Sequence, residues 1–300
     1  MVGLNLHLNS TEGCTFIGIL FSLTLYGITL AQTLFYVQRY SNDHVSFKAL
    51  TAALWILDTA KEMITLQILY FVFVQGHGNI LSLLTLPRTY GAEHALAATT
   101  VFVVHSFYIH NVWRMMTKKR YQVPLTVVGL VLALTSYAAS WGVVYRVYGS
   151  GDLASDVTHV LTPGRVQAAF ASATDIYIAT SMCLVLREAT TGFGPTQTVV
   201  AKLISYAINR GVVLTVLQIL QVGLTASTDT ELDQIFYFPL STVYVNSVLA
   251  VLNARGHLRE KKNGTEYALP LNESNVSAST FHSGHHQAAV MPKSRNIDIC

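Results

Sequence analysis

Long runs of apolar residues recur along the chain and are separated by short polar segments. Seven of these runs reach about 20 residues, the length that crosses a hydrocarbon core of roughly 30 Å as a helix. A backbone exposed to lipid must satisfy its own N–H and C=O groups, so such runs are expected to be helical. The pattern therefore predicts an all-α integral membrane bundle of seven transmembrane helices, at residues 14–37, 49–74, 92–113, 124–146, 165–186, 201–226 and 234–254.

The segments at the two ends of the chain differ from these runs. Residues 1–13 contain no Lys or Arg, so they lack the basic start of a cleaved signal peptide. We expect a short extracellular N-terminus over 1–13 and a transmembrane domain over 14–255. Residues 256–300 are rich in Asn, Ser, His and Lys and have no apolar period, which predicts a disordered cytoplasmic tail.

The composition supports a membrane protein. Charged residues make up 12% of the 300-residue chain, about half the roughly 25% usual in globular proteins, and the mean hydropathy is +0.42. A soluble protein of this size could not cover its surface with so few charges. We therefore expect the lipid bilayer as the main partner and no nucleic acid.

Basic residues beside the spans predict the orientation, because cytoplasmic loops carry an excess of Lys and Arg. With the N-terminus outside, 14 of the 19 Lys and Arg residues lie in inner segments. Only Arg88, Arg146 and Arg165 lie in outer segments, and Lys61 and Arg210 lie within spans. This asymmetry predicts an outer N-terminus and a cytoplasmic C-terminus.

Glycosylation sequons bear on the same question. Asn9 begins an Asn-Ser-Thr sequon on the predicted outer side and is the candidate acceptor. Asn263, Asn272 and Asn275 also begin sequons, but on the predicted inner tail, where short Asn- and Ser-rich segments produce such matches by chance. We keep the orientation given by the basic residues. Since no retention signal is present, we expect a multi-pass protein of the plasma membrane, with an endomembrane as the alternative.

Ionisable residues within spans indicate function by default, because burying a charge in a membrane is costly. Five of them lie near the middle of the membrane: Asp58, Lys61, Glu62, Asp175 and Arg210. Spacings of three and four place the first three on one helical face, and a rise of about 1.5 Å per residue puts all five in one layer near the midplane. Two interpretations stay open: ion pairs that fix helix register, or a polar site for a ligand, an ion or a proton.

Spacing along the helix and depth in the membrane limit which of these charges can form ion pairs. Lys61 can pair with Asp58 or Glu62, while Asp58 and Asp175 are the candidates for Arg210. Three asparagines in the last two spans, Asn209, Asn246 and Asn253, are typical of helix packing through interhelical hydrogen bonds.

No metal or cofactor is expected. His105 and His110 lie on different faces of the third span, and no span contains HxxxH or HExxH, which disfavours a membrane metallohydrolase. The third span ends in His-Asn-Val-Trp-Arg at 110–114, without the Asp/Glu-Arg-Tyr of rhodopsin-like receptors. The seventh span has neither Asn-Pro-x-x-Tyr nor a Lys for a retinal Schiff base, so an ordinary rhodopsin-like receptor and an opsin are excluded.

Residues 244–255, with the sequence YVNSVLAVLNAR, resemble the C-terminal signature of a membrane protein family of mushroom-forming fungi that has no known function. The resemblance covers roughly residues 13–260. Lys61 departs from it, because a His is expected after the Leu-Asp-Thr of the second span. The resemblance implies a seven-helix bundle and a fungal origin, and no activity. Further segments that fit are 25–32, Asp43, Lys48, 54–59, 175–176, 191–193 and 203–211.

Three classes of function fit these features. A receptor-like sensor, with a small-molecule ligand and a cytoplasmic signalling partner, is preferred because of the N-outside topology, the basic loop at 118–120 and the tail. The alternative is a transporter or channel for a small solute or proton, which the midplane charges favour. An intramembrane enzyme ranks last, because no nucleophile–base pair or metal-ligand set is evident, and no catalytic residue is assigned.

Overall fold

The computed structural model describes residues 12–75, 88–116, 119–149, 153–189, 211–224 and 232–266. Throughout these ranges the chain is helical apart from short turns, and no strand occurs in them. The helices are α1 (Glu12–Arg39), α2 (Val45–Tyr70) with the π-helical turn η1 (Phe71–Gln75), α4 (Arg88–Met115), α5 (Lys119–Gly149), α6 (Leu153–Ala189), the helix Gly211–Leu224, and α8 (Gln234–Glu266).

The apolar runs coincide with these helices. Spans one, three, four, five and seven lie within α1, α4, α5, α6 and α8, each of which is long and apolar enough to cross a membrane. Helices α1, α4, α5 and α6 extend beyond the runs at both ends and α8 at its C-terminal end, because a helix need not stop where the hydrocarbon stops. Within the described ranges, the prediction of an all-helical protein is confirmed, and five of the helices are long and apolar enough to cross a membrane.

The other two predicted spans behave differently. The second, 49–74, coincides with α2 and η1, but Asp58, Lys61 and Glu62 lie in its centre and lower its mean hydropathy. Within the sixth, 201–226, the described helix Gly211–Leu224 is shorter than a full span, and residues 201–210 lie outside the described ranges. A count of seven spans therefore stays a prediction.

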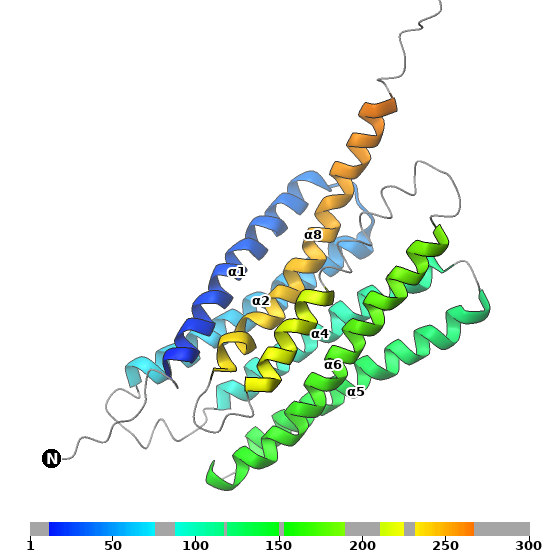
Figure 1. The fold of residues 1–300 in the computed structure, drawn as a ribbon. Coiled ribbons are helices and arrows are strands. Elements are labelled where there is room, and N and C mark those ends of the chain that lie inside the picture. Colours follow the sequence, from blue (N-terminus) through cyan, green and yellow to red (C-terminus); the bar gives the residue numbers. More distant parts are fainter. Residues whose placement is uncertain are drawn as a thin grey trace, which may run out of the picture. The chain divides into compact units, whose positions relative to one another are not determined.

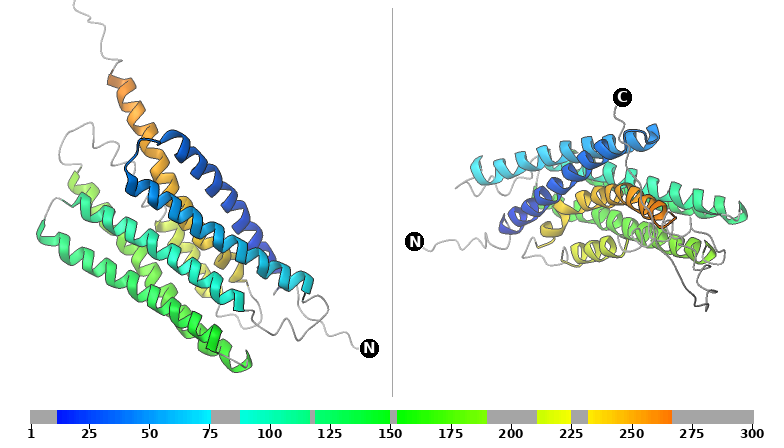
Figure 2. Two further views of the ribbon diagram at one scale, coloured as in Figure 1. Left: turned by 180° about the vertical axis from the view of Figure 1, so that it is seen from behind. Right: turned by 90° about the horizontal axis from the view of Figure 1, so that it is seen from above.

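Consecutive helices run in alternate directions (Figures 1 and 2). We call the end at which α1, α4, α6 and α8 begin the N-end of the bundle, and the opposite end the C-end. In both figures α8 lies between α1 and α2 on one side and α4 and α6 on the other. Its side chains and backbone form hydrogen bonds with α1, α2, α4, α6 and the helix Gly211–Leu224. The central helix is thus the C-terminal one.

Helices α1 and α8 run side by side in the same direction. Asn246 Nδ2 donates to the carbonyl oxygen of Leu25 at 2.9 Å, and Asn253 Nδ2 donates to that of Gln32 at 3.0 Å. Near the N-end, a Cβ on Gly18 would collide with the Gln234 carbonyl, so only glycine permits this close approach. Both asparagines therefore lie at a helix interface, bonded to the backbone of α1.

The C-end half of the bundle is filled by large apolar side chains. Tyr108, Ile109 and Val112 of α4 pack in one buried cluster with Leu249 and Leu252 of α8. Beyond this cluster α8 continues to Glu266, whereas the sequence predicts disorder from 256. The run of Arg, Glu and Lys at 259–262 consists of strong helix formers, which explains the longer helix. Residues 267–300 lie outside the described ranges.

Candidate functional site

Lys61 lies at the centre of a buried charge cluster between α1, α2 and α8. Its side chain is 1% exposed, and its ammonium group has four oxygen partners. It donates to Glu62 Oε1 at 2.8 Å, Ser22 Oγ at 2.7 Å, the Phe238 carbonyl at 2.7 Å and Thr242 Oγ1 at 3.2 Å. Charge pairing together with several hydrogen bonds offsets the cost of removing a cation from water.

Asp58 joins this cluster through a hydroxyl group. Thr242 Oγ1 lies 3.0 Å from Asp58 Oδ1 and 3.2 Å from Glu62 Oε1. The second carboxylate oxygens, Asp58 Oδ2 and Glu62 Oε2, are buried without a hydrogen-bond partner. The structure thus brings Asp58, Lys61 and Glu62 together, with Glu62 as the direct ion-pair partner of Lys61.

Asp175 belongs to a separate polar network, which joins α8 to α4, α6 and the helix Gly211–Leu224. Its carboxylate accepts a short hydrogen bond from the Tyr244 hydroxyl and lies 3.3 Å from His105 Nε2. Tyr244 in turn accepts from Gln218 Nε2 at 2.8 Å, and Ser172 donates to Gln218 Oε1 at 2.7 Å. Four helices, α4, α6, Gly211–Leu224 and α8, are therefore linked through one buried carboxylate.

A third polar group lies closer to the N-end. The Tyr237 hydroxyl donates to Glu93 Oε2 at 2.6 Å and lies 2.9 Å from His94 Nδ1. The single proton of the Tyr237 hydroxyl goes to Glu93, so His94 Nδ1 donates to the Tyr237 oxygen. The other ring nitrogen of His94, Nε2, then accepts from Ser140 Oγ at 3.4 Å. Sequence reasoning missed Glu93 and Tyr237. The only signal was an acidic residue at the second position of the predicted third span, where charged side chains usually reach the interface.

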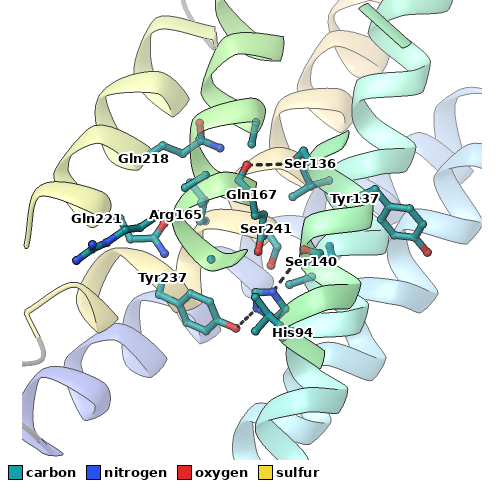
Figure 3. A pocket seen from close by; sticks show the side chains of 18 of the residues that line it. His94, Ser136, Tyr137, Ser140, Arg165, Gln167, Gln218, Gln221, Tyr237 and Ser241 are labelled. Atoms are coloured by element: carbon teal, nitrogen blue, oxygen red, sulfur yellow. Dashed lines mark hydrogen bonds between the residues drawn. The ribbon is translucent and has the colours of Figure 1, made fainter. Parts of the chain in front are cut away.

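A cavity of about 380 Å³ lies between α4, α5, α6, the helix Gly211–Leu224 and α8. Figure 3 shows His94, Ser140, Gln218, Tyr237 and Ser241 around it. His105 also lines it, so the cavity touches both the Asp175 network and the Glu93–Tyr237 pair. The four midplane charges that the structure describes, Asp58, Lys61, Glu62 and Asp175, do not line the cavity.

Charged side chains of the cavity wall lie at its edge. Arg165 and Asp233 line it, Arg165 is exposed, and Asp233 directly precedes the start of α8. The cavity therefore extends toward the N-end of the bundle, whereas the C-end half is filled by the apolar cluster. Across the described ranges, no group of His, Cys, Asp or Glu is arranged to hold a metal ion.

Three further predicted site residues, Arg210, Asn209 and Asn9, lie outside the described ranges. The pairing expected for Arg210 is thus a prediction without a structural counterpart. Asp175, one of its two candidate partners, bonds to His105 and Tyr244 within the described ranges.

At the C-end, the loop between α1 and α2 is joined to α8. Arg255 Nη2 donates to Asp43 Oδ2 at 2.7 Å, and its guanidinium lies 4.3 Å from the centre of the Phe47 ring. Tyr36 also donates to Asp43 Oδ2, at 2.9 Å. Burial alone would raise the pKa of Asp43, but the hydrogen bonds from Tyr36 and Arg255 outweigh it and hold that pKa below its ordinary value.

Comparison with known families adds one finding. Residues 171–257 match the family model described as "Family of unknown function (DUF6534)". No curated protein and no solved structure matches the chain. The DUF6534 segment contains Asp175, Gln218, Ser241, Tyr244 and Arg255, so it includes one wall of the cavity and the C-end ion pair.

Proposed function

We propose that this protein is a receptor-like membrane sensor that binds a small molecule in the cavity at the N-end of a seven-span bundle. In this proposal the N-terminus lies outside, the cavity opens to the outer face, and the C-terminus meets a signalling partner in the cytoplasm. The likeness of residues 244–255 to a fungal family extends the proposal to a fungal origin. The observation that carries it is the cavity itself, because about 380 Å³ lies within the range of small-molecule sites.

The walls of the cavity connect to the rest of the bundle. Tyr237 and Gln218 line it, and each is bonded to a buried group, Glu93 and Tyr244 respectively. Each connection has one partner on α8, the helix that forms hydrogen bonds to α1, α2, α4, α6 and Gly211–Leu224. A ligand that shifts either wall would thus act on α8, which continues to the C-end and forms the Arg255–Asp43 ion pair there. This continuity favours a sensor.

The one-sided position of the cavity argues against transport. A transporter must open its site to each face in turn, but the C-end half is filled by Tyr108, Ile109 and Leu252. The charge cluster that suggested transport, around Lys61, is enclosed by its own hydrogen bonds and does not line the cavity.

A ligand screen with a matched pair of variants tests the proposal. Ala133 lines the cavity on α5 and is 1% exposed, while Ala138 on the same helix is exposed. Ala133→Phe is expected to fill the cavity, and Ala138→Phe to leave it open. Compounds from a diverse library that raise the Tm of the wild type and of Ala138→Phe, but not of Ala133→Phe, would support a ligand site. A screen without any such compound would contradict it.

The sidedness is tested with a cysteine at position 136. Ser136 lines the cavity and is 5% exposed. In a background without the native cysteines, Ser136→Cys is expected to react with a membrane-impermeant thiol reagent added outside oriented vesicles, and not with the reagent enclosed inside. Reaction from both sides would favour a transporter. Reaction only from the inside would overturn the proposed orientation.

A further inference from the structure

The chemistry of the cavity wall narrows the ligand that it takes, and this inference rests on the proposed ligand site. The wall is mainly aliphatic and aromatic, with Val101, Phe102, Val143, Val147 and Leu240 among its residues. Such a surface favours an apolar molecule, because it gains nothing from charged or strongly hydrated groups.

One hydroxyl in this wall has no partner. Ser241 is 4% exposed, and its Oγ is buried without a hydrogen bond. Of the described residues that line the cavity, it alone has a buried polar side-chain atom in this condition. Figure 3 shows it among the polar groups around the cavity, near Gln167 and Ser140. A buried hydroxyl without a partner costs free energy, which a hydrogen-bonding ligand would recover.

Many hydroxyls of the bundle bond their own helix, whereas Ser241 shares its condition with three threonines outside the cavity wall, Thr33, Thr51 and Thr89. In a helix, Ser and Thr commonly bond the carbonyl oxygen four residues earlier on their own backbone. Ser241 makes no such bond. The residues that do so include Thr24, Thr99, Thr100, Ser106 and Thr135.

The electrostatics of the wall exclude a ligand with a full charge. The polar groups deep in the wall, such as His94, Gln218 and Ser241, are uncharged donors and acceptors, while Arg165 and Asp233 lie at the edge. A charged ligand in the deep part would lose its hydration without gaining an ion-pair partner.

We infer that the cavity binds a small uncharged molecule, mainly apolar, whose single hydroxyl or carbonyl group hydrogen-bonds Ser241 Oγ. The alcohol naphthalen-2-ylmethanol represents this class. Three analogues of nearly the same shape differ in one property: 2-ethylnaphthalene lacks the hydrogen-bonding group, 2-naphthoate is anionic, and naphthalen-2-ylmethylammonium is cationic.

The experiment measures binding of the four probes to the full-length protein in nanodiscs by equilibrium dialysis, with empty nanodiscs subtracted to remove lipid partitioning. The alcohol is expected to bind most tightly, and Ala133→Phe to abolish its binding. Ser241→Ala should weaken the alcohol by about twofold to tenfold, the range of one net hydrogen bond, and leave the hydrocarbon unchanged. Ser247→Ala is the matched control, because Ser247 bonds its own helix backbone.

The outcomes separate this inference from the proposed function. Tighter binding of either charged probe, lost in Ala133→Phe, would overturn the ligand class and leave the ligand site standing. An equal effect of Ser241→Ala on the alcohol and the hydrocarbon would overturn the hydrogen bond to Ser241. If none of the four probes binds in a way that Ala133→Phe abolishes, the inferred class is wrong, while the library screen decides the ligand site independently.

Discussion

The charge cluster around Lys61 and the cavity beside α8 lie in the same bundle but satisfy their polar groups in different ways. In the charge cluster, four oxygen atoms surround one ammonium group, and the two side-chain oxygens left without a hydrogen bond belong to the carboxylates of Asp58 and Glu62. The cavity wall, apart from Arg165 and Asp233 at its edge, carries amide, hydroxyl and imidazole groups, and the Ser241 hydroxyl there has no hydrogen-bond partner. Buried charges therefore bind helices to each other here, whereas uncharged groups stay available for a ligand.

Removing the cation should have the largest effect on this comparison. Lys61→Met leaves Glu62 buried without its ion-pair partner and is expected to lower the free energy of unfolding by about 3–5 kcal/mol. Unfolding in mixed detergent micelles measures it. The double variant Lys61→Met/Glu62→Gln should recover part of the loss, and Lys48→Met, at an exposed position, should cost little. A loss below about 1 kcal/mol in the single variant would show that the cluster does not stabilise the bundle.

The second prediction concerns the hydrogen bond between Tyr237 of the cavity wall and the buried Glu93. Tyr237→Phe removes the hydrogen bond to the buried Glu93 carboxylate and is expected to cost about 2–3 kcal/mol, because an acceptor that can be charged loses its partner. Tyr145→Phe is the control, since Tyr145 is 75% exposed. Equal stability of the two variants in the same unfolding assay would contradict the assigned bond.

How far the sequence predicts these regions depends on the range of the interactions. The i, i+3 and i+4 spacing places Asp58, Lys61 and Glu62 on one face, and the structure has them buried together. Their partners Ser22 and Thr242 come from other helices, so the choice of Glu62 over Asp58 depends on tertiary packing, which a single sequence does not encode locally.

The residues that sequence reasoning missed share one property: their roles depend on hydrogen-bond partners, or the lack of one, on other helices. The sequence does not distinguish Ser241 from any other serine in a helix, because a helical serine usually bonds its own backbone. From the sequence, Glu93 is expected to be a charge at the membrane interface, and only the structure shows that Tyr237 bonds it. Long apolar runs, by contrast, predict helices with no tertiary information, and α1, α4, α5, α6 and α8 bear this out.

A matched pair of glycines sharpens the comparison on the side of the charge cluster. Gly18 lies one turn before Ser22, and a Cβ there would collide with the Gln234 carbonyl, whereas Gly27 has open space around it. Gly18→Ala is expected to cost about 1–2 kcal/mol by forcing α1 from α8. Gly27→Ala should be neutral or stabilise the helix by up to about 1 kcal/mol. Equal effects on Tm would contradict the close approach.

The smallest predicted effect concerns pH at the C-end. The pKa of Asp43 is lowered in the folded protein, so its contribution to stability is fully present above the ordinary Asp pKa. That contribution is lost as the pH falls from there through the lowered value. Because this ion pair is partly exposed, the loss should not exceed about 1 kcal/mol. The Tm of the wild type, measured from pH 6 down to about pH 3, should therefore converge toward that of Asp43→Asn. Parallel curves would contradict the assignment.

The two asparagine bonds between α1 and α8 have a mechanical consequence. Leu25 and Gln32 are seven residues apart, and so are Asn246 and Asn253. A slide of α8 along α1 by one residue or one turn would break both bonds at once, and only a slide of seven residues would bring Asn246 to Gln32. The two bonds together therefore fix the register of α8 against α1. A ligand that acts on α8 is therefore expected to tilt or rotate this helix rather than to slide it along α1.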